Sequence, residues 1–591
     1  MYLCYVVKSP LDMLRSCAEP TCSKRSNNGR LDFPHACSKV RLICSILKQP
    51  ENSALQKTLS ETGLAGERLA EATRLLRAGA YEQAHGLCLA VLKEAPRTAQ
   101  AYYLLGQLAL DHGNIGKAEE LFAVTVQLDP RHAGALAQQA RCLLALSRRS
   151  DAVATVRAAA ASAPEDAFTC DTIGVVMSRA GLHEDALPYY ARATEAEPGN
   201  ANYQYNFAAA LQFAGDMDRA RDAYLRCAAA DPDDTRGLPS LVQITRQTPE
   251  ENYIPALEAM FIRHQEDADA ALRIGHALAK THEDLKQPGD ALAWLARAKA
   301  GKRRLIRHTP DVDSALFAAA GALAETLPVA PAPSGEGPVF ICGMPRTGTT
   351  LVDRILTSHS AVTPAGELSD FALCLKRLAK TPSNLVLDPE TLGAARGMDL
   401  SALGTAYLHS VRTSLGLAEL FTDKMPLNIL LAPVILAALP GARIICLRRH
   451  PADTVLSNYR QMFATSFSYY NYAYTLEDTA RYYAGFDRLV RRYEEVLPAD
   501  RFTVVHYEKI VTDQEAETRR VLAFCGLPFE EGCLAFHQNA APVATASSAQ
   551  VREPLYTSAL GRWRRYEAGL QPALDILEAE GCLTPGERRR G

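Results

Sequence analysis

Small positions recur along the first half of the chain with a period of 34 residues. Prolines mark this period at positions 96, 130, 164, 198 and 232. Twelve residues before each proline stands an alanine: Ala84, Ala118, Ala152, Ala186 and Ala220. A second small position, twelve residues earlier again, holds Gly106, Ala140, Gly174 and Ala208. Small residues let two helices approach closely and a proline ends the second of them, so the pattern predicts five helical hairpins over residues 66–234.

This period and its small residues resemble the tetratricopeptide repeat (TPR). Residues 235–327 are expected to form a degenerate repeat and a helical adaptor, in which Gly275 and Ala291 take the small positions. Stacked repeats form a solenoid whose concave groove usually binds an extended peptide or a partner protein. We therefore expect a protein partner in the groove. A role of the repeats as a scaffold, or in a homodimer, stays open.

The second half of the chain alternates apolar strand-like runs with helical stretches. The runs stand at residues 339–342, 442–447 and 501–507. This alternation predicts an α/β domain with a central parallel sheet, helices on both faces, and ligands at the carboxyl ends of the strands. We place this domain at residues 339–575, after a Pro-rich linker at residues 328–338 and before a tail at residues 576–591.

A glycine turn follows the first of these strands and opens a helix near Gly348. The spacing Gly343-x4-Gly348 is that of a phosphate-binding loop, because the first N–H groups of a helix lack intrahelical partners and point at an anion. Thr349 stands where a nucleotide triphosphatase carries its lysine. Arg346 instead places a permanently charged guanidinium in the loop. The pattern predicts a bound phosphate other than a triphosphate.

The pattern Gly-x-Pro-Arg-[Ser/Thr]-Gly-Thr-Thr-Leu at residues 343–351 resembles the 5′-phosphosulfate loop of sulfotransferases. These enzymes move a sulfuryl group from 3′-phosphoadenylyl sulfate (PAPS) to a hydroxyl or an amine. The resemblance covers residues 338–575, and with the repeats it indicates a TPR-containing sulfotransferase whose transferase domain is similar to the tyrosylprotein sulfotransferases. It implies PAPS as co-substrate, no metal, and a loop that binds PAPS through Arg346, Thr347, Gly348, Thr349 and Thr350.

The resemblance also implies a 3′-phosphate clamp, made by an arginine at a strand end and a serine eight residues later. Arg449 and Ser457 have this spacing. A guanidinium and a hydroxyl donor suit a dianionic phosphate. Tyr507 ends a predicted strand that resembles a late strand of the family, in which a tyrosine lies near the adenine. Ser547 and Arg562 are assigned to a loop that closes over the nucleotide, and three further basic residues compete with Arg562: Arg552, Arg564 and Arg565.

Three residues are expected to carry the chemistry: Glu367, Lys424 and Arg346. In the tyrosylprotein sulfotransferases a glutamate at the distance of Glu367 from the loop arginine is the general base that accepts the acceptor proton. His359 is the alternative base, since other branches use a histidine. Lys424 resembles a lysine that reaches the sulfate and the bridging oxygen, where a fixed positive charge stabilises the transition state.

Composition limits the remaining possibilities. The formal net charge of −3 does not favour a nucleic-acid partner. No run of eighteen apolar residues predicts a membrane span, so we expect a cytoplasmic protein. The fifteen cysteines do not form a zinc pattern or a disulfide framework. Residues 1–60 carry no repeat; we expect a disordered leader, with a targeting segment or an overextended start as alternatives.

We therefore expect a sulfotransferase that acts on a hydroxyl, with tyrosine of a peptide or protein selected by the TPR groove as acceptor. A sugar hydroxyl of a glycan or glycolipid fits the predicted base equally well, with the repeats as a scaffold. Two alternatives belong to other classes. A kinase on the same loop would need magnesium and an ATP-binding lysine, which the loop lacks. A non-catalytic interaction scaffold would carry a vestigial transferase domain.

Overall fold

The computed structural model describes residues 58–146, 148–329, 337–416, 420–465, 468–539 and 550–584. The chain divides into two compact units, and the division falls between Ala214 and Gly215. The leader expected at residues 1–60 lies almost wholly outside the described residues, and so do the centre of the linker and the end of the tail.

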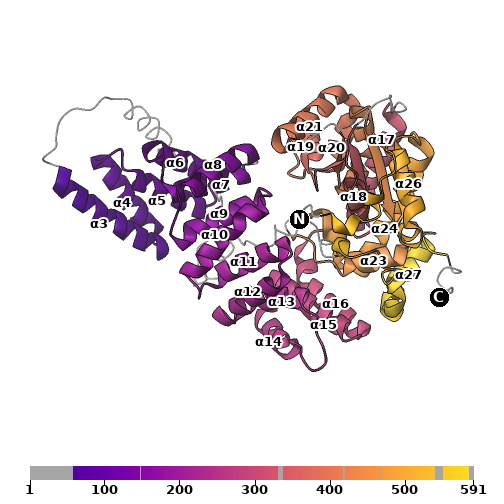
Figure 1. The fold of residues 1–591 in the computed structure, drawn as a ribbon, viewed down its shortest axis with the longest axis horizontal. Coiled ribbons are helices and arrows are strands. Elements are labelled where there is room, and N and C mark those ends of the chain that lie inside the picture. The colour runs from indigo at the N-terminus through magenta and orange to yellow at the C-terminus, as the bar shows by residue number, and fades with distance from the viewer. Residues whose placement is uncertain are drawn as a thin grey trace, which may run out of the picture. The chain divides into compact units, whose positions relative to one another are not determined.

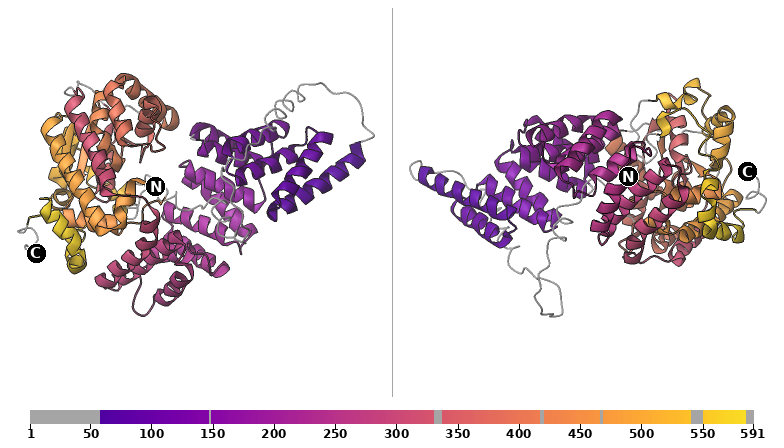
Figure 2. Two further views of the ribbon diagram at one scale, coloured as in Figure 1. Left: turned by 180° about the vertical axis from the view of Figure 1, so that it is seen from behind. Right: turned by 90° about the horizontal axis from the view of Figure 1, so that it is seen from below.

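The unit that ends at Ala214 consists of consecutive helices that pack in pairs (Figure 2). A Cβ atom at Gly106 would lie 2.6 Å from the ring of Phe122, and one at Gly174 would lie 2.8 Å from the ring of Tyr190. These glycines therefore permit the close helix contact that the period predicts. The helices are α3 (Thr58–Arg77), α4 (Tyr81–Glu94), α5 (Ala99–Asp111), α6 (Ile115–Leu128), α7 (Ala133–Ala145), α8 (Arg149–Ala161), α9 (Ala167–Arg179), α10 (His183–Ala196) and α11 (Ala201–Ala214).

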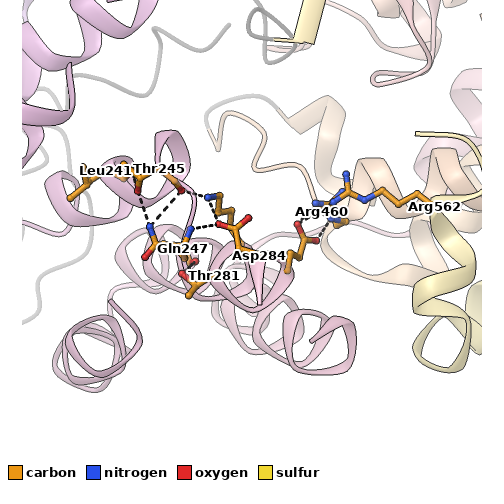
Figure 3. Close-up of polar contacts among 10 residues, drawn as sticks. Leu241, Thr245, Gln247, Thr281, Asp284, Arg460 and Arg562 are labelled. Carbon is orange, nitrogen blue, oxygen red and sulfur yellow. Dashed lines mark hydrogen bonds and ion pairs between the residues drawn. The ribbon is translucent and has the colours of Figure 1, made fainter. Parts of the chain in front are cut away.

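The unit that begins at Gly215 starts with six more helices: α12 (Met217–Ala230), α13 (Gly237–Ile244), α14 (Ile254–His264), α15 (Ala268–Asp284), α16 (Pro288–Leu305) and α17 (Pro310–Thr326). Helices α15 and α16 pack as a hairpin, with Gly275 against Ala298. Asp284 ties α15 to the end of α13, because its Oδ2 accepts from Gln247 N at 2.8 Å (Figure 3). Within the described ranges, no helix is long and apolar enough to cross a membrane.

A parallel five-stranded sheet follows in the same unit (Figure 1), with the strand order β2-β3-β1-β4-β5. All five residues of the central strand β1 are buried, as in a sheet that helices cover on both faces. The strands are β1 (Val339–Gly343), β2 (Thr363–Pro364), β3 (Phe421–Asp423), β4 (Arg443–Arg448) and β5 (Phe502–His506).

Side chains alternate between the two faces of the sheet. Ile341 and Val505 share one core with α18 (Thr349–Thr357) and α26 (Gln514–Phe524). Phe340 packs its ring against Phe371 of α19 (Asp370–Ala379) and Tyr407 of α21 (Leu400–Leu415), at centroid distances of 6.2 and 5.7 Å. The predicted fold, a helical repeat region followed by an α/β domain with a parallel sheet, is confirmed.

Candidate functional site

The loop that joins β1 to α18 contains three residues with positive φ: Gly343 (+140°), Arg346 (+67°) and Gly348 (+103°). A Cβ atom at Gly343 would lie 2.6 Å from the carbonyl oxygen of Leu447, and one at Gly348 would lie 2.7 Å from the ring of Tyr507. Both positions therefore require glycine. Arg346 adopts the left-handed conformation at an energetic cost, which is typical of residues held in place for function.

Three successive carbonyl oxygens of this loop are held by side chains. Met344 O accepts from Thr347 Oγ1 at 2.7 Å, and Pro345 O accepts from Asn458 Nδ2 at 2.8 Å. Arg346 O accepts from the guanidinium of Arg449 at 3.4 Å. The Thr347 hydroxyl thus stabilises the loop itself.

At the mouth of the loop begins the first turn of α18, with Thr349 and Thr350 buried. The N–H groups of a first helical turn lack intrahelical acceptors and attract anions. The Nη2 of Arg346, in the same loop, donates to Gln550 Oε1 at 3.0 Å. The loop therefore has the geometry of an anion cradle.

Glu367 and Lys424 meet directly, although 57 residues separate them. Lys424 follows β3, and its backbone N–H donates to Gly366 O at 2.9 Å, which fixes the two segments side by side. Its Nζ forms an ion pair with Glu367 Oε1. The side chain of Lys424 is 1% exposed and that of Glu367 16%, so the carboxylate forms the accessible side of the pair.

Two buried carboxyl groups beside this pair were missed from the sequence. Asp353 of α18 accepts from Thr422 Oγ1 at 2.7 Å; burial raises its pKa, and the charge of Lys424 opposes that rise. Asp423 accepts from Tyr407 Oη at 2.8 Å, and burial raises its pKa to about 8. Asp423 adjoins Lys424 in the sequence, but nothing in a single chain indicated which way either acid points.

His359, the alternative base, is engaged in the structure. Its Nδ1 accepts from Ala361 N at 3.1 Å, so the proton resides on Nε2, which donates to Pro528 O at 3.1 Å. Glu530 Oε1 lies 3.3 Å from the same Nε2. Both ring nitrogens of His359 are thus engaged near the end of α18.

Arg449 lies next to the phosphate loop, directly after β4. Its guanidinium carbon stands 4.7 Å from the ring centroid of Tyr507, and its Nη2 donates to Ala559 O. Its Nε is buried and has no hydrogen-bond partner among the described residues. A buried charged donor without an acceptor is costly, and a bound phosphate oxygen would satisfy it.

The neighbouring arginine points elsewhere. Arg448 forms an ion pair with Asp487 of α24 (Leu476–Val496), away from Arg449. Ser457 is half-buried on α23 (Pro451–Tyr459), the helix that begins two residues after Arg449. The structure therefore brings Arg449, Tyr507 and the loop together and places Ser457 on the adjoining helix.

The C-terminal closing segment is docked by Asp453, which the sequence analysis did not identify. Its two carboxylate oxygens accept from Gly561 N and Trp563 N, each at 2.9 Å. The Trp563 ring stacks on His450 at 5.5 Å. These contacts fix η8 (Arg562–Tyr566) against the start of α23.

Arg562 lies near α15. Its Nη2 stands 3.6 Å from Glu283 Oε2 (Figure 3), and within the described ranges no hydrogen bond or ion pair joins it to Arg449 or the loop. Arg564 lies over the Trp563 ring at 4.8 Å, while Arg552 and Arg565 are exposed. Ser547 lies outside the described residues. The closing segment thus contributes the Ala559 carbonyl and Gln550 to the site.

Comparison with known proteins gives a match for each half of the chain. Residues 338–531 match the model of the sulfotransferase family, and residues 69–133, 108–167 and 178–235 match the tetratricopeptide repeat. An uncharacterized protein of Aquifex aeolicus (strain VF5) is 33% identical over 245 residues, 41% of this chain and 32% of that protein. A protein-tyrosine sulfotransferase of Drosophila melanogaster is 24% identical over 269 residues, 42% of this chain and 52% of that protein.

Among solved structures, the sulfotransferase domain of the Synechococcus PCC 7002 olefin synthase is 20% identical and has a TM-score of 0.31. It matches 43% of this chain and 98% of that domain. The chain spans about a third and about half of the length of the two curated relatives, respectively.

Proposed function

We propose an activity for a chain that joins tetratricopeptide repeats to a domain of the sulfotransferase family: it transfers a sulfuryl group from PAPS to a hydroxyl acceptor. One observation carries this proposal. Three features lie together at the carboxyl edge of one parallel sheet: a loop with Arg346 at positive φ before a helix, the partly exposed Glu367 carboxylate paired with a buried lysine, and Arg449, whose buried Nε has no hydrogen-bond partner among the described residues.

The donor is proposed to bind at two points. The 5′-phosphosulfate would lie on the loop, where Arg346 and the N–H groups from Gly348 to Thr350 supply positive charge. The 3′-phosphate would take the Arg449 guanidinium and the Ser457 hydroxyl. Two observations support this placement of the donor. The Nε of Arg449 is buried, and the backbone at Gly348 is packed so closely that it leaves no room for a Cβ atom. Tyr507, in contact with both, is proposed to border the adenosine.

Transfer then needs a base and a stabilised leaving group. The acceptor oxygen forms a bond to sulfur while the bond from sulfur to the 5′-phosphate oxygen breaks. The bonding electron pair leaves with that oxygen, and Glu367 takes the acceptor proton. An ammonium has three N–H donors, so Lys424 can hold Glu367 and also bind the oxygens on which charge develops. Lys424 is 1% exposed in the structure, so this second contact requires the residues around it to move as the donor binds.

Peptide tyrosine is the acceptor that we propose. The chain is similar over 42% of its length to a protein-tyrosine sulfotransferase, and the repeats provide a surface of the kind that binds extended peptides. The repeats would select the partner that presents the tyrosine.

Incubation of the full chain with PAPS labelled on sulfur and a cell extract tests the proposal. We expect label in protein, released as tyrosine sulfate after digestion, and its loss in Arg346→Ala and Glu367→Gln. Label in carbohydrate would correct the acceptor class and leave the transferase activity standing. No transfer from PAPS to any component by a protein that binds the donor would refute the proposed activity.

A further inference from the structure

The α15–α16 hairpin packs against the sulfotransferase domain within the same compact unit. Lys299 of α16 is 2% exposed, and its Nζ donates to Ala473 O at 2.7 Å. The rings of Tyr459 and Tyr474 lie 5.0 and 5.5 Å from the same Nζ. Burial lowers the pKa of Lys299 to about 7. Burying a charged side chain costs free energy. We infer that the hydrogen bond from Lys299 to Ala473 O holds the segment that contains Ala473 in place.

That segment is η4 (Ser468–Tyr474), and it leads to the phosphate loop. Tyr472 of η4 stacks on Tyr482 at 3.7 Å and donates from its hydroxyl to Asn458 Oδ1 at 3.0 Å. Asn458 in turn donates to Pro345 O of the loop at 2.8 Å. Lys299 is therefore connected to the loop through one short segment and three hydrogen bonds.

A second connection starts from Glu283 of α15. Its carboxylate accepts from the guanidinium of Arg460, which follows α23, and from the hydroxyl of Tyr566 at 2.9 Å. Arg562 approaches the same carboxylate, and Figure 3 shows Arg460 and Arg562 extending toward each other. Glu283 thus joins the end of α23 to η8; Arg449 precedes α23 and donates to Ala559 O, just before η8. The next residue, Asp284, binds the end of α13.

We propose that the α15–α16 hairpin is a positioning element of the transferase site: Lys299 sets η4 and through it the phosphate loop, and Glu283 sets α23 and η8 around Arg449. Helices α15 and α16, which end the repeat region, then help to form the transferase site in addition to connecting the repeats to it. The inference rests on the proposed function only for the ligand used in the second test below.

The first test needs no ligand. Hydrogen–deuterium exchange on the full chain reports local opening segment by segment. We expect Glu283→Gln and Tyr566→Phe to raise exchange at residues 456–465 and 559–566, and Lys299→Met to raise it at residues 468–474 and 343–350. Tyr566→Phe removes a single hydroxyl, so it keeps the test valid if Glu283→Gln folds poorly. Unchanged exchange in these segments would overturn the proposal.

Glu325→Gln provides the matched control. Glu325 of α17 accepts from Arg492 Nε at 3.0 Å and Nη2 at 2.9 Å, so it is also a helix carboxylate paired with an arginine of the sulfotransferase domain. Among the residues that the structure describes, no hydrogen bond or ion pair links Glu325 or Arg492 to the loop, α23 or η8. We expect no change in exchange at residues 343–350 or 559–566 in this variant.

The second test is calorimetric titration with adenosine 3′,5′-bisphosphate (PAP), the product that PAPS leaves. Loss of one positioning hydrogen bond is expected to raise the Kd about three- to tenfold in Glu283→Gln and in Lys299→Met, and not in Glu325→Gln. Normal Kd values in both variants would overturn the positioning role. Failure of the wild-type chain to bind PAP would instead refute the proposed function, and the exchange test would then decide the inference alone.

A purely structural role predicts a different result for Lys299→Met. The substitution removes a desolvated ammonium, so we expect the Tm to hold or rise while the Kd for PAP rises. A residue that only supports folding would lower the Tm and leave the Kd of the folded protein unchanged. Such an outcome would contradict the proposal for Lys299.

Discussion

Replacement of Arg449 by alanine separates recognition of the 3′-phosphate from general binding of an adenine nucleotide. In the structure the Nε of Arg449 is buried and has no hydrogen-bond partner in the part of the chain that the structure describes, and the guanidinium carbon lies 4.7 Å from the centroid of the Tyr507 ring. A charge-assisted hydrogen bond is worth about 1.5–3 kcal/mol, so the substitution should raise the Kd for PAP about 10- to 150-fold.

The ratio of two affinities makes this prediction specific. Arg449 also donates to Arg346 O and Ala559 O, so its loss loosens the site for every nucleotide. AMP lacks the 3′-phosphate, so its affinity should fall only as far as the loosened site weakens binding of any adenine nucleotide. We therefore expect calorimetry at one fixed salt concentration to show a PAP affinity that falls at least tenfold more than the AMP affinity. Equal losses for the two ligands would refute the assignment of Arg449.

The adjacent Arg448 supplies the control. Its partner Asp487 is buried, with 3% of its side chain exposed, so Arg448→Ala leaves this carboxylate with Arg491 as its remaining ion-pair partner and should lower the Tm. We expect the ratio of PAP to AMP affinity to stay at the wild-type value in the folded variant. A loss of discrimination in Arg448→Ala but not in Arg449→Ala would mean that the two arginines have the opposite roles.

Three further predictions concern chemistry, pH and the repeats. Glu367→Gln should lower kcat by about 10²- to 10⁴-fold with little change in the Kd for PAP, in initial rates and calorimetry, and a normal kcat would exclude Glu367 as the base. Burial raises the pKa of Asp423 to about 8, so the folded chain keeps a proton that the unfolded chain loses near pH 4. Its contribution to the free energy of unfolding therefore falls, by up to about 1.4 kcal/mol per pH unit, as the pH rises through this window. Thermal unfolding from pH 5 to 8 should show a flatter dependence in Asp423→Asn, and the same slope in both proteins would contradict the assignment. Gly106→Ala should cost about 1–3 kcal/mol, because the new Cβ would lie 2.6 Å from the Phe122 ring, whereas Gly116→Ala, with nothing within 4 Å, should gain up to about 1 kcal/mol of helix stability. Equal effects of these two substitutions in denaturant titrations would contradict the helix packing.

The parts of the molecule that could be predicted from the sequence depend on local chemistry. The helical hairpins follow from a spacing of small residues that each close helix contact requires, as Gly106 and Gly174 show. The loop after β1 follows from an apolar strand and from glycines at positions where a Cβ would clash. Both signals lie within one or two elements, so a single sequence displays them.

The parts that could not be predicted depend on tertiary contacts between distant segments. Lys424 and Glu367 were assigned separate tasks, and nothing in their spacing indicated that they form an ion pair. The resemblance places Arg562 at the nucleotide, and a sequence cannot show that in the fold it approaches Glu283 of a helix that precedes the domain. Asn458, which holds the loop, adjoins the predicted Ser457 and has no motif of its own.

A crystal structure of the full chain with PAP would test most directly whether the loop binds the 5′-phosphate and Arg449 binds the 3′-phosphate. We expect the 5′-phosphate to accept hydrogen bonds from the N–H groups at Gly348–Thr350, and the 3′-phosphate to lie within hydrogen-bond distance of the Arg449 guanidinium. A nucleotide bound with its 3′-phosphate away from Arg449, or with its 5′-phosphate outside the loop, would contradict the proposed binding of PAPS and with it the proposed function.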